Sequence, residues 1–366
     1  EEKRKELIKL TDIREGIGLP VMMEGEWISH PEKLWAKLDQ LASTRKDTIQ
    51  LTSQHAEETV LVEAFIKGRE FSCIENDNGA PMALPPTEIR KIKDLFDYRS
   101  KYLPGISRKI TPIELPDGDI QRIRKQCERL FTALHCQVYA RIDGFYTEDG
   151  GIFLNDPNTT SGMLPSSFFF HQAAEIGLNP SQFLTYIIRT SLAARIKTGK
   201  MIHQMKGLLK KLDTEIQLLA VSEVKKINVG VIMGGFSSER HISVESGRNI
   251  FEKLASSTKY HPVPIFLTGN EENHELYLLP VNIMLKDNAD DIREKLHAAA
   301  SKSEHPVIGH IKTEANGITN TYAPGTILKY KQINYEDLSG LVDAVFIALH
   351  GRPGEDGAVQ VELEKL

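Results

Sequence analysis

The sequence predicts a mixed fold, with an α+β first half, an α/β second half and a helical connector between them. Three observations support this prediction. A strong β-hairpin signal lies near the middle of the chain, where two strand-like runs flank a Gly-rich turn. A lysine-rich amphipathic segment follows it, as expected for a helix with one solvated face. Further on, buried strands lead through Gly-rich turns into helices, which is typical of an open parallel sheet.

The length and composition favour more than one globular domain. The chain has 366 residues, more than a single domain usually holds. Hydrophobic residues make up 40% and charged residues 26%, so sizeable cores can form. The pattern predicts four regions: a helical region over 1–62, an α+β domain over 63–194, the connector over 195–226 and an α/β domain over 227–366.

The composition also excludes several classes of partner. A net charge of −5 gives no general attraction to nucleic acid. No apolar run approaches the roughly 20 residues of a membrane span, and the charged start Glu1–Lys5 is unlike a secretory signal. Cys73, Cys127 and Cys136 show no C-x-x-C spacing, so we expect free thiols in a reducing, cytoplasmic setting.

Helices are predicted in three places before the connector. Residues 1–58 read as charged and helical, with a capping-box pattern at Ser29–Glu32. A second helix starts after Gly118–Asp119. Asn179 caps the third, with Pro180 at its first position. We expect this third helix to turn five apolar residues inward: Phe183, Leu184, Ile187, Ile188 and Leu192.

The hairpin carries hard oxygen ligands on both of its strands. Strand-like runs over 137–142 and 151–154 flank the turn, and we expect Asp143, Asp156 and Asn158 to converge. Mg²⁺ prefers one or two carboxylates together with substrate phosphates over a cage made only of protein ligands. The pattern therefore predicts a Mg-nucleotide site and phosphoryl transfer.

An acidic strand-turn-strand precedes the hairpin. Strands are predicted at Val60–Val62 and Glu70–Ile74, on either side of a turn at Lys67–Gly68. Its acidic and apolar residues suit an adenine and its ribose, and they equally suit an ordinary strand-turn-strand.

Two Gly-rich turns follow buried strands in the α/β half. Ligands on open parallel sheets bind beyond the carboxyl ends of the strands, which is where Gly234–His241 and Leu349–Gly357 lie. Glu239 suits an ammonium group at that edge, or it is a helix-dipole residue. His350 takes part in chemistry or orients its loop. Zinc is disfavoured there because no second His or Cys lies at ligand spacing.

These segments together resemble the D-alanine–D-alanine ligases of the ATP-grasp superfamily. The matching segments are Val60–Phe71, Arg141–Met163, Ser166–Ser167, Val229–Ile250 and Leu349–Gly357. The resemblance implies an ATP-grasp C-terminal-type domain, with an antiparallel sheet and helices, joined to a Rossmann-like pre-ATP-grasp domain. It implies a ligase that joins two D-alanines for peptidoglycan synthesis, using ATP and Mg²⁺ or Mn²⁺, and it permits a homodimer.

The resemblance also implies roles for individual residues. The Mg²⁺ or Mn²⁺ ligands are Asp143, Asp156 and Asn158. The catalytic group comprises Arg141, Gly162, Glu239 and His350. The ATP-binding residues are Glu63, Phe65, Ile66, Glu70, Lys101 and Asn155. D-Alanine is bound by Tyr102, Ser166, Ser167 and Glu239.

The chain departs from the family pattern in three respects. Asp156 stands where the family usually has Glu, and the metal-binding half precedes the α/β half instead of following it. Leu19–Glu26 replaces the family's Lys-Pro strand and Gly-Ser-Ser phosphate loop. Three explanations stay open: a piece of a tandem protein, a circular permutant, or residues missing from the chain as printed. The alternative function is a ligase-like module that binds nucleotide or D-alanine without turnover.

Overall fold

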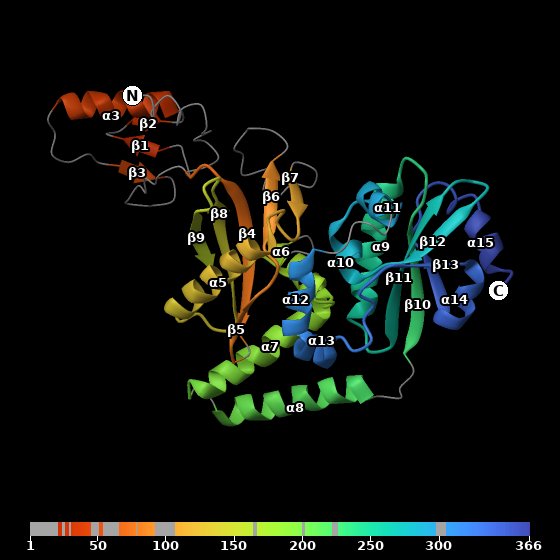
Figure 1. Ribbon diagram of the computed structural model, residues 1–366. Coiled ribbons are helices and arrows are strands. Elements are labelled where there is room, and N and C mark those ends of the chain that lie inside the picture. The colour runs from red at the N-terminus through yellow and green to blue at the C-terminus, as the bar shows by residue number, and fades with distance from the viewer. Residues whose placement is uncertain are drawn as a thin grey trace. The chain divides into compact units, whose positions relative to one another are not determined.

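A computed structural model describes most of the chain, in two compact units. The described residues are 21–23, 26–28, 31–44, 51–53, 66–77, 79–91, 107–163, 167–199, 202–221, 226–297 and 305–366. The first unit comprises 1–70, 89–110 and 145–151, and the second comprises 71–88, 111–144 and 152–366. Figure 1 labels most of their helices and strands.

The first unit contains a small antiparallel sheet with a helix. The strands β1 (Val21–Met23), β2 (Glu26–Ile28) and β3 (Leu51–Ser53) lie in the order β2-β1-β3, and α3 spans Pro31–Ser43. The helical prediction for residues 1–58 is therefore wrong at these strands. Cross-strand pairing explains the difference, because Met22 lies opposite Trp27 and Val21 opposite Ile28.

A larger sheet carries the predicted hairpin. Its strand order is β7 (Ser107–Ile110), β6 (Thr87–Lys91), β4 (Arg69–Asp77), β8 (Tyr139–Tyr146), β9 (Ile152–Asn158), with β5 (Pro81–Ala83) on β4. The hairpin between β8 and β9 is confirmed. Thr147 N donates to Gly151 O over 3.0 Å, and Gly150 turns the chain with φ of 80°.

The second unit also contains three helices before the connector. They are α5 (Asp117–Ala133), α6 (Phe168–Glu175) and α7 (Pro180–Lys197). The predicted cap of α7 is confirmed, because Asn179 and Gln182 exchange hydrogen bonds in a capping box. Ile188, however, is 54% exposed, so its inward prediction is wrong. The connector is helical, as α8 (Ile202–Val221), and Arg189 of α7 pairs with Asp213 of α8 at 2.7 Å.

The α/β part has a mixed sheet. The predicted strands β10 (Ile227–Gly234), β11 (Tyr260–Gly269) and β14 (Ala344–Ile347) are parallel. Two antiparallel strands that the sequence did not predict, β12 (His274–Leu278) and β13 (Lys331–Ile333), extend the sheet to the order β13-β12-β11-β10-β14. Gly269 permits the hairpin between β11 and β12, since its φ is +104° and Asn270 N donates to Asn273 O in the turn.

Helices cover both faces of this sheet. One apolar cluster lies under α9 (Arg240–Ala255), α10 (Val281–Lys286) and α11 (Ala289–His297). The other lies under α14 (Tyr335–Leu341) and α15 (Ala358–Leu363). Two short helices, α12 (Pro306–Glu314) and α13 (Asn316–Tyr322), precede β13. Among the described residues, no helix combines the length and apolar character that a membrane crossing requires.

The second unit has two parts. The hairpin half is its portion within residues 71–199, and the α/β half is residues 226–366. Each half contains some of the predicted site residues.

Candidate functional site

Five of the predicted site residues lie outside the described residues. They are Glu63, Phe65, Lys101, Tyr102 and Ser166. Ile66 and Glu70 are described, in the first unit, and both are half-buried. Lys109, in the same unit, has an unusual pKa that the sequence did not indicate. Burial lowers the pKa of its ammonium group to about 8.

Arg141 and Asp143 form a two-point ion pair on β8. Arg141 Nε donates to Asp143 Oδ1 and Arg141 Nη2 donates to Asp143 Oδ2, each over 3.1 Å. Residues two apart on a strand share a face, which brings the two side chains together. Asp143 is buried and Arg141 half-buried. The guanidinium therefore holds both oxygens of the carboxylate, the group predicted to bind a metal ion.

The end of β9 presents the other predicted oxygen ligands. Asn155 and Asp156 are exposed, and Asn158 is half-buried. Asp156 has φ of +47°, a left-handed conformation that Asp tolerates better than most residues. Asn158 Nδ2 donates to the Asp156 carbonyl over 2.7 Å, which leaves the Asn158 side-chain oxygen for another partner.

The segment after the hairpin leads to the start of α6. Gly162 is exposed, and an added Cβ there would meet no atom of the described residues within 4 Å. Ser167 is the N-cap residue of α6, but its hydroxyl makes no capping bond. That hydroxyl oxygen is buried and has no hydrogen-bond partner among the described residues.

Glu239, His350 and Glu355 come together at the ends of the parallel strands. One potential ligand atom of each lies within 4.8 Å of the others. Glu239 is the N-cap residue of α9, yet its side chain makes no cap hydrogen bond, so capping does not explain it. Sequence reasoning singled out Glu239 and His350 but gave Glu355 no role.

Two serines fix the loops that carry this cluster. Ser237 Oγ donates to the His350 carbonyl over 2.7 Å and accepts from Glu239 N over 3.1 Å. Ser246 Oγ lies 2.9 Å from His350 Nε2 and sets the direction of the imidazole. The sequence gave no signal for these contacts, because Ser237 and His350 are far apart in the chain. Gly351 permits the approach, since an added Cβ would lie 2.9 Å from Ser237 Oγ.

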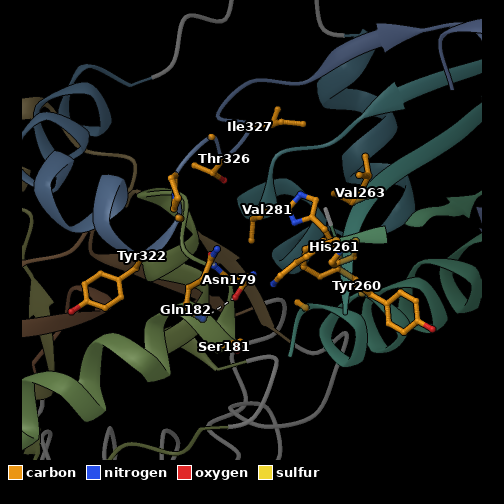
Figure 2. Close-up of a pocket in the computed structure, with 18 of the residues that line it drawn as sticks. Asn179, Ser181, Gln182, Tyr260, His261, Val263, Val281, Tyr322, Thr326 and Ile327 are labelled. Atoms are coloured by element: carbon orange, nitrogen blue, oxygen red, sulfur yellow. Dashed lines mark hydrogen bonds between the residues drawn. The ribbon is translucent and has the colours of Figure 1, made fainter. Parts of the chain in front are cut away.

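A pocket of about 370 Å³ lies elsewhere in the second unit (Figure 2). Asn179 and Gln182 line it from the start of α7, His261 and Val263 from β11, and Tyr322 from α13. Burial, and then nearby Lys226, lower the pKa of His261. None of the predicted site residues lines this pocket, so it is separate from the candidate catalytic groups.

Comparison with protein families gives two matches in reversed order. The model described as "D-ala D-ala ligase C-terminus" matches residues 40–189. The model described as "D-ala D-ala ligase N-terminus" matches residues 228–366.

Individual relatives carry the same description. D-alanine–D-alanine ligase B of Clostridium perfringens is 35% identical over 141 residues, which are 38% of this chain and 45% of that protein. The ligase of Halalkalibacterium halodurans is 30% identical over 160 residues, 42% of this chain and 51% of that protein. The chain thus spans about half the length of the curated relatives it matches.

Solved structures of ligases also resemble parts of the chain. D-alanine–D-alanine ligase from Bacillus anthracis has 28% sequence identity and a TM-score of 0.33, covering 53% of this chain and 58% of its own. VanG D-Ala:D-Ser ligase from Enterococcus faecalis has 22% identity and a TM-score of 0.32, covering 50% of this chain and 60% of its own.

Proposed function

The chain belongs to the D-alanine–D-alanine ligase family, and from this premise we propose that it takes part in the ATP-dependent joining of two D-alanines. The product would be a precursor of peptidoglycan. The observation that carries the proposal is the cluster of Glu239, His350 and Glu355, because the family resemblance assigns the first two to the first D-alanine.

The cluster suits the ammonium group of an amino acid. Glu239 and Glu355 are both exposed acids, so their carboxylates can exchange water for a cationic ligand without a large desolvation cost. In the proposed site the ammonium of the first D-alanine binds Glu239. His350, held by Ser246, keeps the loop in place beside it.

The proposed chemistry has two steps. A carboxylate oxygen of the first D-alanine attacks the γ-phosphorus of ATP, the bond to the β–γ bridging oxygen breaks, and ADP leaves. The amine of the second D-alanine then attacks the acyl phosphate, loses a proton and expels inorganic phosphate. Arg141 and the Gly162 N–H would donate to the oxyanion, and one such donor is typically worth about 10²–10³ in rate.

The hairpin fits Mg²⁺ or Mn²⁺. Asp143, Asp156 and the side-chain oxygen of Asn158 supply the carboxylate and amide oxygens that such ions prefer. When bound, the ion neutralises charge on the phosphates of ATP. The guanidinium has five N–H donors, so Arg141 can keep one bond to Asp143 and still reach an oxyanion.

A second candidate function is nucleotide or D-alanine binding without turnover. The observation that favours it is the segment Leu19–Glu26, which has neither a Lys-Pro strand nor a Gly-Ser-Ser loop to hold the phosphates. Release of ADP with ATP, Mg²⁺ and D-alanine separates the two functions. D-alanine-dependent turnover supports the ligase, whereas nucleotide binding without turnover supports the module.

Two variants test the assigned residues. Asp143→Ala should abolish Mg²⁺-dependent nucleotide binding, measured by calorimetry, while Glu148→Ala in the exposed hairpin turn should not change it.

Glu239→Gln should raise the D-alanine concentration that the reaction requires, with Glu272→Gln as the exposed control. An unchanged requirement in Glu239→Gln would reject the ammonium role.

A further inference from the structure

Helix α6 belongs to the cores of both halves. It has eight residues, and all of Phe169–Glu175 are buried. On the side of the hairpin half, Gln172 Oε1 accepts from Ile74 N of β4 over 2.8 Å. On the other side, Ala174 lies in the same apolar cluster as Met233 and Met284 of the α/β half. The helix therefore has no solvent-facing side to spare.

A buried ion pair joins α6 to α10 across the boundary between the halves. Glu175 pairs with Lys286, and their side chains are 4% and 9% exposed. Asn282 Nδ2 donates to the second oxygen of Glu175 over 2.9 Å, and Lys286 Nζ also donates to the Thr111 carbonyl over 3.2 Å. A buried carboxylate or ammonium is costly unless it is paired, so these charges are placed for a docked state.

The turn between α6 and α7 fits closely against the α/β half. Thr319 Oγ1 donates to the Ile176 carbonyl over 2.8 Å, and Thr326 Oγ1 donates to the Gly177 carbonyl over 3.2 Å. A Cβ at Gly177 would lie 2.7 Å from Thr326 Cγ2. Any side chain at Gly177 would push the two segments apart.

Two more polar contacts lie along the same boundary. Arg124 of α5 donates to Glu314 of α12 over 2.5 Å, and His305 Nε2 lies 3.0 Å from the Leu115 carbonyl. The pocket of Figure 2 is also lined from both halves, by Asn179 on one side and His261 on the other.

From these contacts we infer that the two ligase-type halves of this chain dock on each other as one unit, despite their reversed order. The docking surface consists of α6, the α6–α7 turn and α5 on one half, and α10, α12, α13 and Thr326 on the other. Halves that belonged to separate tandem units would not need matched buried charges across this surface. The inference does not depend on catalysis, and its test measures association.

The first experiment cuts the connector in the full chain. A specific protease site replaces Lys200–Met201, and gel filtration at low micromolar concentration follows the two pieces after cleavage. We expect them to co-elute. Lys286→Glu, which places like charge against Glu175, should weaken association at least about 30-fold, whereas Lys365→Glu, at an exposed pair within its own half, should not. Combining Glu175→Lys with Lys286→Glu should restore part of the loss.

Separation of the unaltered pieces would overturn the inference, as would equal behaviour of the two charge-reversal variants.

A second experiment uses the uncut chain, and it tests the same inference if the pieces aggregate after cleavage. Thr319→Ala with Thr326→Ala should speed hydrogen exchange in residues 168–178 about tenfold or more. Thr321→Ala is the control, because that hydroxyl donates to the Gly317 carbonyl of its own helix. Equal exchange in both variants would also overturn the inference.

Discussion

The two halves of the second unit have different kinds of interior. In the hairpin half, Arg124, Glu75 and Gln172 are buried, and Gln172 bonds to the backbone of β4. In the described part of the α/β half, the only buried polar residues are Ser243, Thr268 and Asp287, and two apolar clusters fill the space around the sheet. Hydrocarbon burial is insensitive to pH, whereas buried polar groups are stable only with their partners. The two interiors should therefore respond differently to the same kinds of perturbation.

The largest effect is expected from Phe266→Ala in the α/β half. Phe266 is 1% exposed and belongs to one of the two apolar clusters. Removing its ring leaves a cavity and should lower the free energy of unfolding by about 3–5 kcal/mol. Urea denaturation at pH 6 and pH 8 should give the same loss, since no titrating group is removed. A loss that depends strongly on pH would break the proposed contrast.

In the hairpin half, Arg124→Met should lower the free energy of unfolding by about 3 kcal/mol. The guanidinium is 2% exposed, and it donates to the Ala83 carbonyl through Nε at 3.0 Å and Nη2 at 2.7 Å. The variant leaves that buried carbonyl without these donors. Arg122→Met on the same helix is the matched control, because its pair with Asp119 lies at the surface and is worth little. Comparable losses in both variants would contradict a polar interior.

Glu75→Gln should stabilise the hairpin half at neutral and higher pH. Burial, and next the Cys73 thiol, raise the pKa of Glu75 well above its usual value. A raised folded-state pKa means that stability is full below the unfolded pKa of about 4.3 and is lost as pH rises toward the folded value. Gln keeps the shape without that loss, so the gain should be on the order of 1 kcal/mol at pH 8 and vanish near pH 4.

Thermal unfolding across this pH range measures the effect, with the exposed Glu148→Gln as control. A gain that stays constant from pH 4 to pH 8 would show that a proton on Glu75 is not the cause. The α/β half should show no counterpart, because its described core contains no buried Glu.

Local signals in the sequence explain which parts of the fold could be predicted. The hairpin turn, the Asn179 cap and the strand before Gly234 each depend on a few neighbouring residues. The strands β3 and β13 were missed because they pair with strands far away in the chain, which no local pattern specifies. The strands β1, β2 and β12 belong to local hairpins that the sequence analysis did not identify. The helical prediction at the N-terminus failed for the same reason, since charge composition there gave no indication of cross-strand pairing.

The candidate site shows the same division. Gly-rich turns after buried strands indicated Glu239 and His350, because the edge of a parallel sheet is set by the order of elements. The roles of Glu355, Ser237 and Ser246 depend on how two loops meet, and no spacing in the sequence encodes that contact. The pairing of Arg141 with Asp143 could have been anticipated, since they are two apart on one strand.

The smallest effect is expected at surface ion pairs, and it tests whether the contrast is confined to the interiors. Asp290 accepts two hydrogen bonds from Arg240 in the α/β half, and Asp213 accepts one from Arg189 beside the hairpin half, with similar exposure. The hydrogen bond from Arg240 lowers the pKa of Asp290. The stabilisation of the fold by this ion pair is therefore present above the unfolded pKa of Asp and is lost as pH falls. Asp290→Asn and Asp213→Asn should each cost about 0.5 kcal/mol at pH 7 and less in high salt. Equal small losses in urea titrations would locate the difference between the halves in their cores. A several-fold larger loss for Asp213→Asn would extend the polar character of the hairpin half to its surface.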